Sequence, residues 1–302
     1  METLDAKALR TFMAVVRLGT IRGAAEQMNV APSVVSRQIA ETERSLGLAL
    51  FDRSTRGVML TEAGELVLEH GKRVLEDNGL LAEQLDQLKG VQQGRVRICC
   101  GEGFLADLVQ HALRLFVEVY PTVRYSIQLG SSEQVLDAIA NGDADIGVAY
   151  NPVIDTRVRS LAIARQPLCL VAPIDHPLLG RERVALVECL ARPCALLGKG
   201  HGVTQLVGRV AADAGAALAP LVETTSIDVL RRFVSAGLGV TFLPRFAVST
   251  ELGRAALGVV ELSDPLLAEA SSHVMVRARR RLPLSVDRLA GCMAREMVAF
   301  QT

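Results

Sequence analysis

Tryptophan is absent from this 302-residue sequence, and aromatic residues make up only 4% of it. Proteins that bind single-stranded nucleic acid stack the bases on exposed rings, so this class of protein is disfavoured. No apolar run approaches the ~18 residues of a membrane-spanning helix. The first ten residues, METLDAKALR, are polar and mixed in charge, which does not suit a signal peptide. The sequence therefore predicts a globular cytoplasmic protein without membrane contact.

The usual patterns of metal binding and catalysis are also missing. The six cysteines form no C-x-x-C pair, and the five histidines lie far apart without H-E-x-x-H spacing. There is no G-x-S-x-G, and GKGHG (198–202) lacks the spacing of a phosphate-binding loop. We expect reduced, buried cysteines; a thiol sensor is the alternative, which the spacing does not support. No catalytic residue, metal ion or cofactor is predicted, so an enzyme is disfavoured.

Net charge gives no sign of a nucleic-acid partner, because 33 basic and 33 acidic residues balance. Residues 1–60 hold eight basic and six acidic side chains, which is a small excess. An argument for nucleic-acid binding must therefore depend on where the basic residues lie.

The first fifty residues contain three helical segments. The first has an apolar face at i, i+3, i+4 and i+7, made by Leu9, Phe12, Met13 and Val16. Gly19 ends this helix, and Thr20 suits the start of the second. Pro32 fits the first position of a third helix, where its missing N–H is not needed. Two helices joined by a short turn, behind a supporting helix, form a helix-turn-helix.

Two extended arms and a long helix follow. The arms span residues 48–61 around a polar turn at 52–57, and this wing would carry Arg53 and Arg56 at its tip. From Thr61 to about Leu88 the pattern is that of one helix, whose seam repeats at steps of 3 and 4: Gly64, Val67, Gly71, Val74, Asn78, Leu81, Leu85 and Leu88. So long a helix needs support, and we predict that it pairs with a second copy, with Gly64 and Gly71 allowing close approach. Packing on its own domain is the alternative.

Beyond a short linker, strand-like and helical runs alternate. The predicted strands are 96–100, 125–129, 146–149, 168–171, 195–197 and 240–243, and the predicted helices are 104–119, 132–140, 205–214 and 226–236. This alternation indicates α/β architecture with parallel strands. Two such halves would leave a cleft between them at the strand ends.

The order of these parts resembles the LysR-type transcriptional regulators over essentially the whole chain. The resemblance is strongest in residues 9–64. There the family's double alanine falls on Ala24 and Ala25, its Val-Ser-Arg-Gln-Ile on 35–39, its LGxxLFxR on 46–53 and its LTxAG on 60–64. Segments 130–149 and 224–244 resemble family segments more loosely.

This resemblance implies three parts: a winged helix-turn-helix DNA-binding domain in 1–60, a linker and dimerisation helix in 61–90, and an effector-binding domain in 91–302. The last would have the two-lobed α/β fold of type 2 periplasmic binding proteins, with lobe I in 94–164 and 268–302 and lobe II in 165–267. The implied function is sequence-specific regulation of transcription on double-stranded promoter DNA. A small-molecule effector would alter the oligomer, a dimer of dimers, and RNA polymerase is a further candidate partner.

The third helix would enter the major groove with its N-terminal residues, as recognition helices do. The candidate DNA contacts are Arg22, Pro32, Ser33, Val34, Ser36, Arg37, Gln38, Arg53 and Arg56. Taken alone, this face could equally be an ordinary solvated helix surface; the resemblance decides for DNA. Many relatives carry Ser-Gln-Pro where this chain has Ala31, Pro32 and Ser33, so the base preference of relatives does not transfer.

Four helix starts would converge on the cleft between the implied lobes, and helix N-termini with free N–H groups bind anions. The candidate effector contacts are Glu102, Gly103, Phe104, Ser131, Ser132, His201, Thr204, Thr225 and Ser226. Each could instead only cap its helix. Glu102 and Gly103 stand where relatives often carry hydroxyl residues. A carboxylate there disfavours a purely anionic effector and permits one with a cationic group.

A solute-binding protein is the rival function, and residues 94–302 alone would support it. The N-terminal helix-turn-helix and the lack of a signal peptide argue against it.

Overall fold

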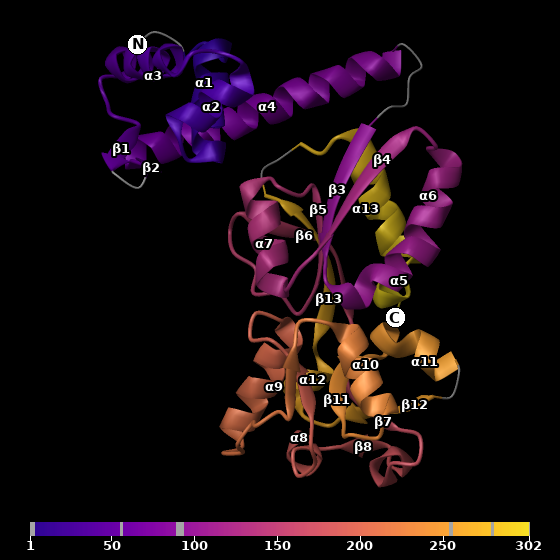
Figure 1. Cartoon of the computed structure of the whole chain (residues 1–302). Coiled ribbons are helices and arrows are strands. Elements are labelled where there is room, and N and C mark those ends of the chain that lie inside the picture. Colours follow the sequence, from indigo (N-terminus) through magenta and orange to yellow (C-terminus); the bar gives the residue numbers. More distant parts are fainter. Residues whose placement is uncertain (1–3, 55–56, 89–93, 254–255, 279–280, 302) are drawn as a thin grey trace. The chain divides into compact units, whose positions relative to one another are not determined.

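The computed structural model of the chain describes residues 4–54, 57–88, 94–253, 256–278 and 281–301 (Figure 1). The chain forms two compact units, Met1–Gln84 and Leu85–Thr302. Among the residues that the structure describes, no helix combines the length and apolar character that crossing a membrane requires.

The first unit is a helix-turn-helix with a β-hairpin wing, as predicted. Its elements are α1 (Ala6–Leu18), α2 (Ile21–Met28), α3 (Pro32–Leu46), β1 (Phe51–Ser54), β2 (Gly57–Leu60) and the start of α4 (Glu62–Leu88). Thr20 caps α2 by accepting a hydrogen bond from the Gly23 amide at 3.0 Å. Phe12, Ile39 and Leu50 are fully buried, so α1, α3 and the segment before the wing share one core.

The long helix α4 packs on its own unit through two glycines. A Cβ at Gly64 would lie 2.2 Å from the carbonyl oxygen of Leu50, and one at Gly71 would lie 2.9 Å from Leu9. The prediction that these glycines admit a partner helix was wrong, because their open sides are filled by α1 and the segment before the wing. Among the seam residues whose side chains the structure describes, the exposed ones lie in the later part: Leu81 is 54% exposed and Leu85 47%.

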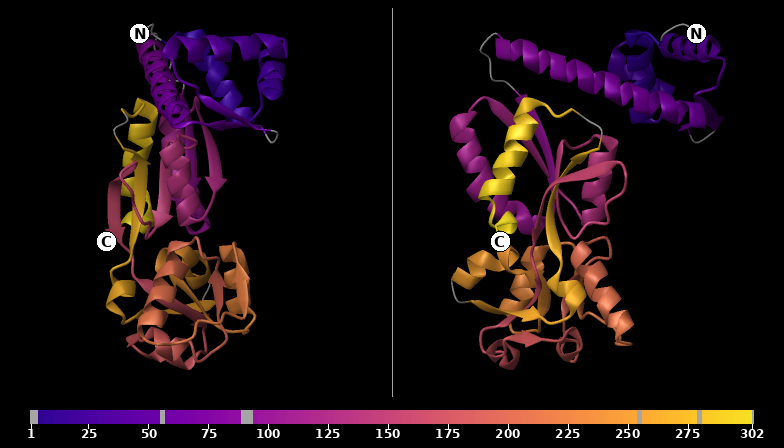
Figure 2. Two further views of the ribbon diagram at one scale, coloured as in Figure 1. Left: turned by 90° about the vertical axis from the view of Figure 1, so that its left-hand side faces the viewer. Right: turned by 180° about the vertical axis from the view of Figure 1, so that it is seen from behind.

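The second unit has two lobes, each with β-sheet at its centre and helices around it (Figures 1 and 2). The first lobe consists of β3 (Gly94–Cys100), η1 (Glu102–Phe104), α5 (Leu105–Asp107), η2 (Leu108–Leu113), α6 (Arg114–Val119), β4 (Val123–Leu129), α7 (Ser132–Asn141), β5 (Ile146–Tyr150), β6 (Val158–Arg165), β13 (Ser271–Arg277), α13 (Leu284–Glu296) and η5 (Val298–Phe300). Its strand order is β4-β3-β5-β13-β6. Helices α7 and α13 lie on opposite faces of this sheet (Figure 2).

The second lobe lies between β6 and β13 in the sequence. It consists of β7 (Leu168–Pro173), η3 (Pro177–Gly180), β8 (Arg183–Val184), α8 (Leu186–Cys189), β9 (Ala195–Leu197), α9 (Gly202–Asp213), β10 (Val222–Thr224), α10 (Ile227–Ser235), β11 (Thr241–Pro244), η4 (Arg245–Val248), α11 (Ser249–Gly253), β12 (Leu257–Leu262) and α12 (Pro265–Ala268). The strands pair as β11-β7-β12-β8 and as β10-β9. A parallel bridge from Cys194 to Val240 joins these two sets.

The predicted strands and helices are present, but the predicted parallel arrangement holds for only some of the strands. In the first lobe β3 pairs in parallel with β4 and β5, whereas β13 is antiparallel to β5 and β6. In the second lobe β11 and β12 both run antiparallel to β7. The strands β7 and β13, which run against their neighbours, each follow one of the two crossings between the lobes. At these crossings the amide of Gln166 donates to the carbonyl of Ala270 at 2.7 Å.

Candidate functional site

The exposed face of α3 begins in the first turn of the helix. Pro32, Ser33 and Val34 are exposed there, whereas Val35 and Ile39 point into the core of the first unit. No side chain caps this helix, because Ala31 at the N-cap position offers no oxygen. The first turn therefore presents a hydroxyl, apolar side chains and the polar backbone of a helix start to solvent.

Two of the candidate arginines are strongly exposed. Arg37, one turn further along α3, lies 3.6 Å from the carboxylate of Glu41, and 77% of its side chain is exposed. Arg22, in the first turn of α2, lies 3.2 Å from Glu26 and is 85% exposed. Exposed ion pairs of this i,i+4 kind contribute about 0.3–0.5 kcal/mol. Both guanidinium groups can therefore exchange their carboxylates for phosphate oxygens with little loss.

The remaining candidate DNA contacts differ in burial and in whether they already make contacts within the chain. Ser36 is half-buried, and the side-chain oxygen of Gln38 accepts a hydrogen bond from the Thr11 hydroxyl at 2.9 Å, which ties α3 to α1. Arg53 lies in β1, where its backbone pairs with Val58. The side chain of Arg53 and the whole of Arg56 lie outside the described residues.

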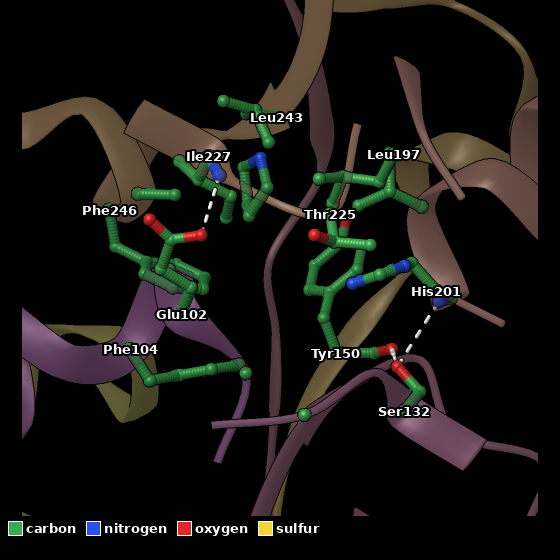
Figure 3. A pocket seen from close by; sticks show the side chains of 17 residues that line it. Glu102, Phe104, Ser132, Tyr150, Leu197, His201, Thr225, Ile227, Leu243 and Phe246 are labelled. Carbon is green, nitrogen blue, oxygen red and sulfur yellow. Dashed lines mark hydrogen bonds between the residues drawn. The ribbon is translucent and has the colours of Figure 1, made fainter. Parts of the chain in front are cut away.

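A small cavity lies between the two lobes of the second unit (Figure 3). Six of the predicted effector contacts line it: Glu102, Gly103, Phe104, Ser132, His201 and Thr225. They come from all four helix starts that the sequence pattern singled out. The predicted convergence of these helix starts is therefore present.

Glu102 reaches across this cavity to the start of α10 (Figure 3). Its Oε2 accepts a hydrogen bond from the Ile227 amide at 2.6 Å. Its Oε1 accepts hydrogen bonds from the Ser226 hydroxyl at 3.1 Å and from the Asp228 amide at 3.3 Å. Ser226 is the N-cap residue but makes no cap with its own side chain, so Glu102 caps α10 from the other lobe. The carboxylate is thus directed at α10 and not left for a cationic group of an effector.

A second contact between the lobes joins Ser132 to the start of α9. The Ser132 hydroxyl donates to the carbonyl of Tyr150 and accepts from the amide of Gly202, each at 3.1 Å (Figure 3). A Cβ at position 202 would lie 2.1 Å from that same carbonyl oxygen, so this approach requires glycine. Both α9 and α10 therefore receive their cap from a side chain of the first lobe.

Three predicted effector contacts do not line the cavity. Ser131 accepts a hydrogen bond from the Gln134 amide as the N-cap of α7, Thr204 donates to the Leu197 carbonyl at 2.7 Å, and Ser226 donates to Glu102. The Ser131 hydroxyl thus caps its own helix, which is the alternative that the sequence left open. The Thr204 and Ser226 hydroxyls are instead engaged with the Leu197 carbonyl and with Glu102 of the other lobe.

The apolar wall of the cavity was missed by the sequence analysis. It consists of Tyr150, Leu197, Val203, Ile227, Leu243, Pro244, Phe246 and Ala247. The rings of Phe104 and Phe246 have centroids 4.7 Å apart. Burial raises the pKa of Tyr150 well above its usual range, and its hydroxyl donates to the carbonyl of Gln166 at 2.7 Å. Tyr150 and Leu243 lie at or near the ends of their strands. Because ligands bind beside strand ends in such folds, this position could have predicted that both residues line the cavity.

The cavity is small, and His201 is the one titratable basic side chain among its described lining residues. No lysine or arginine of the described ranges lines it, and Nδ1 of His201 lies 3.0 Å from the Gly198 carbonyl oxygen. Its volume of about 40 Å³ has room for a few water molecules, whereas small-molecule pockets have about 300–1,000 Å³. A small molecule can therefore enter only if the lobes or the lining side chains move apart.

Two family patterns match this chain. The family described as "Bacterial regulatory helix-turn-helix protein, lysR family" matches residues 6–65, and "LysR substrate binding domain" matches residues 89–298. The chain belongs to the LysR family of transcriptional regulators. The two matches confirm the resemblance seen in the sequence. LysR-type regulators are DNA-binding proteins with an effector-binding domain and are not enzymes.

Several curated relatives match this LysR-type regulator over most of their length. It is 30% identical over 274 residues to the HTH-type transcriptional regulator CbbR of Rhizobium meliloti (strain 1021), covering 87% of this chain and 84% of the relative. It is 29% identical over 297 residues to the SDS degradation transcriptional activation protein of Pseudomonas sp. (strain ATCC 19151), covering 97% and 96%.

A solved structure of a full-length OxyR variant from Pseudomonas aeruginosa is similar in fold. Its TM-score is 0.76 at 23% sequence identity, and the match covers 99% of this chain and 97% of that one. At this level of identity the likeness shows the fold of the LysR-type regulator alone.

All six cysteines of this LysR-type regulator are buried and free. Burial raises the pKa of the Cys100, Cys169 and Cys189 thiols to about 12. It also raises the pKa of the remaining thiols, Cys99, Cys194 and Cys292. The thiolate is the reactive form of cysteine, so the thiol-sensor alternative is disfavoured. Within the described ranges no cluster of His, Cys, Asp or Glu is placed to hold a metal ion.

Proposed function

We propose that this regulator reads promoter DNA with α3 and senses a small molecule in the cavity between its lobes. The observation that carries the proposal is that both lobes line one cavity. A molecule that enters it changes how the lobes meet, and only such a difference in affinity between two arrangements can shift an equilibrium. The proposed domains are 1–60 for DNA, 61–90 for pairing and 91–302 for the effector, with lobe I in 94–164 and 268–302 and lobe II in 165–267.

For DNA, we assign base contacts to the first turn of α3. Pro32 and Val34 offer apolar atoms suited to a thymine methyl group, and Ser33 offers a hydroxyl. Arg37 with Ser36 would hold phosphate or a guanine edge, and Arg22 a phosphate. Gln38 can still donate through its amide nitrogen. Arg53 and Arg56 on the wing would contact the minor groove or the backbone.

For self-association, we assign the pairing surface to the later part of α4. Leu81 and Leu85 recur at seam spacing and are exposed, and Asn78 beside them is exposed as well. A second surface for a dimer of dimers is suggested by α6, where Leu115, Val117 and Val119 are exposed. The assembly would bind an operator dyad in the cytoplasm, where promoter DNA is found. RNA polymerase is the candidate partner of the DNA-bound form.

The test of this function has two steps. Rounds of selection from random DNA duplexes should enrich a sequence that the full-length protein binds in gel shifts. A thermal-shift screen of metabolites should then find a compound that raises the unfolding midpoint by mass action and changes the gel-shift pattern. If no duplex is enriched above random DNA, the proposal fails at its first step.

A further inference from the structure

The Glu102 carboxylate fills a position that is suited to an anion. Three donors at the start of α10 converge on it: two backbone amides and the Ser226 hydroxyl. The helix has nine residues, and its N-terminal amides have no partner within the helix. A negatively charged group is stabilised there by the free amides and the helix dipole together.

The backbone beside Glu102 is built for this close approach. A Cβ at Gly103 would lie 3.0 Å from Cδ1 of Ile227 and 3.2 Å from Cβ of Ala247. Any side chain at 103 would therefore press on α10 and η4. Glycine at this position brings η1 against the second lobe and places the preceding carboxylate within hydrogen-bond distance of the Ile227 amide.

A free carboxylate would have to displace Glu102 to bind these amides. Groups held in one chain compete at an effective concentration in the millimolar range or above, so a dilute external anion is at a disadvantage. The rest of the cavity offers an anion no compensation, because its wall is mostly apolar and none of its described lining residues is lysine or arginine.

We propose that Glu102 determines the specificity of this cavity by supplying, from within the chain, the anion that α10 binds. An effector that enters this cavity is then an uncharged, mainly apolar small molecule. The identity of that effector rests on the proposed function; the role of Glu102 as an internal carboxylate ligand does not.

The experiment is a chemical rescue in the full-length protein. Glu102→Ala removes the carboxylate and should lower the thermal unfolding midpoint. Sodium acetate or formate should restore the midpoint in a saturable way, whereas acetamide and sodium chloride at the same concentration should not. Glu133→Ala is the matched control, because the Glu133 carboxylate also meets the second lobe but accepts from the Gln205 side chain and not from a helix start. Wild type and this control should show no acetate effect beyond that of chloride.

Hydrogen exchange supplies a readout at the amides themselves. The amides of Ile227 and Asp228 should exchange about tenfold faster or more in Glu102→Ala, because a hydrogen bond to a charged acceptor is lost, and acetate should slow them again. Glu102→Gln keeps the shape of the side chain and should give intermediate exchange rates. This variant supplies the test if the alanine variant does not fold.

The proposal is overturned if exchange at these amides is unchanged in Glu102→Gln, if acetate fails to stabilise a folded Glu102→Ala protein, or if acetate stabilises wild type equally. None of these readouts uses DNA. Failure of the proposed regulatory function would leave them as they are, so the two failures can be told apart.

Discussion

The hydroxyl of Ser132 accepts a hydrogen bond from the amide of Gly202, 3.1 Å away in the opposite lobe. Ser132→Ala would leave this amide, at a buried position, without its acceptor. We expect the free energy of unfolding to fall by about 1–3 kcal/mol. Urea unfolding of the full-length protein measures this. Ser235→Ala, at an exposed position in the last turn of α10, should change stability by no more than about 0.5 kcal/mol. Equal stability of the two variants would show that the Ser132 contact adds nothing.

Arg37→Ala should weaken binding to the selected operator by about 1–3 kcal/mol if the guanidinium makes a bidentate base contact. The side chain is exposed on the face of α3 that carries Ser33 and Val34. Fluorescence anisotropy at fixed salt is the measurement. Arg44→Ala removes the same charge from the exposed last turn of α3 and should have a smaller effect. If both variants lose affinity equally and for every DNA sequence, Arg37 acts only through net charge.

Replacing Leu81 and Leu85 together by lysine should split the dimer. Both side chains are exposed in the single chain, so the substitutions should spare its fold, while like charges would meet in a paired seam. Sedimentation velocity gives the mass. A control that replaces exposed Ile174 and Leu221 of the second lobe by lysine makes the same change of charge. A wild-type mass for the Leu81 and Leu85 variant would rule out pairing through this part of α4.

Thr225→Val keeps the volume of a cavity-lining side chain and removes its hydroxyl (Figure 3). We expect the affinity for a metabolite found in the screen to fall by about 0.5–1.5 kcal/mol, the contribution of one neutral hydrogen bond. Calorimetric titration measures this. Thr204→Val is the control, because the Thr204 hydroxyl donates to Leu197 and does not line the cavity. An unchanged affinity in Thr225→Val would mean that the hydroxyl does not touch the effector.

The thiols should be unreactive in the folded protein at neutral pH. With the pKa of Cys100, Cys169 and Cys189 raised to about 12, almost no thiolate is present at pH 7, and reaction with Ellman's reagent should accelerate as the pH rises. Because the unfolded thiols ionise first, these groups also reduce stability as the pH rises from about 9 toward 12. Guanidinium should release all six thiols for titration. Rapid reaction of any thiol in the native protein at pH 7 would contradict this account.

The elements of this fold were predictable where the pattern is local. The helix predicted at 132–140 is α7 (Ser132–Asn141), since its apolar spacing is set within a few residues. Strands β6, β12 and β13 were not predicted, and neither was the antiparallel direction of β13. Ser272 of β13 pairs with Tyr150 of β5, far away in the sequence, and periodicity carries no information on strand direction.

The positions of the site residues could be predicted from local sequence, but their contacts across the two lobes could not. Glycines and hydroxyl residues marked the four helix starts, but the direction of the Glu102 carboxylate depends on how two separately built lobes meet. The same limit explains the glycines of α4. A seam at steps of 3 and 4 has the same spacing whether it packs on a partner or on its own domain, so Gly64 and Gly71 were placed on the wrong contact.

The contacts of Gly64 and Gly71 pack the first part of α4 directly against the helix-turn-helix, where the Leu50 carbonyl oxygen and the side chains of Leu9 and Met13 fill the space that Cβ atoms would occupy. If two copies of α4 pair, this packing would hold each recognition helix α3 at a set position relative to its own copy of α4. The dimer would then favour operators whose two half-sites are separated by one particular distance. Inserting half a helical turn, about five base pairs, between the half-sites of the operator would place the second half-site on the wrong face of the duplex.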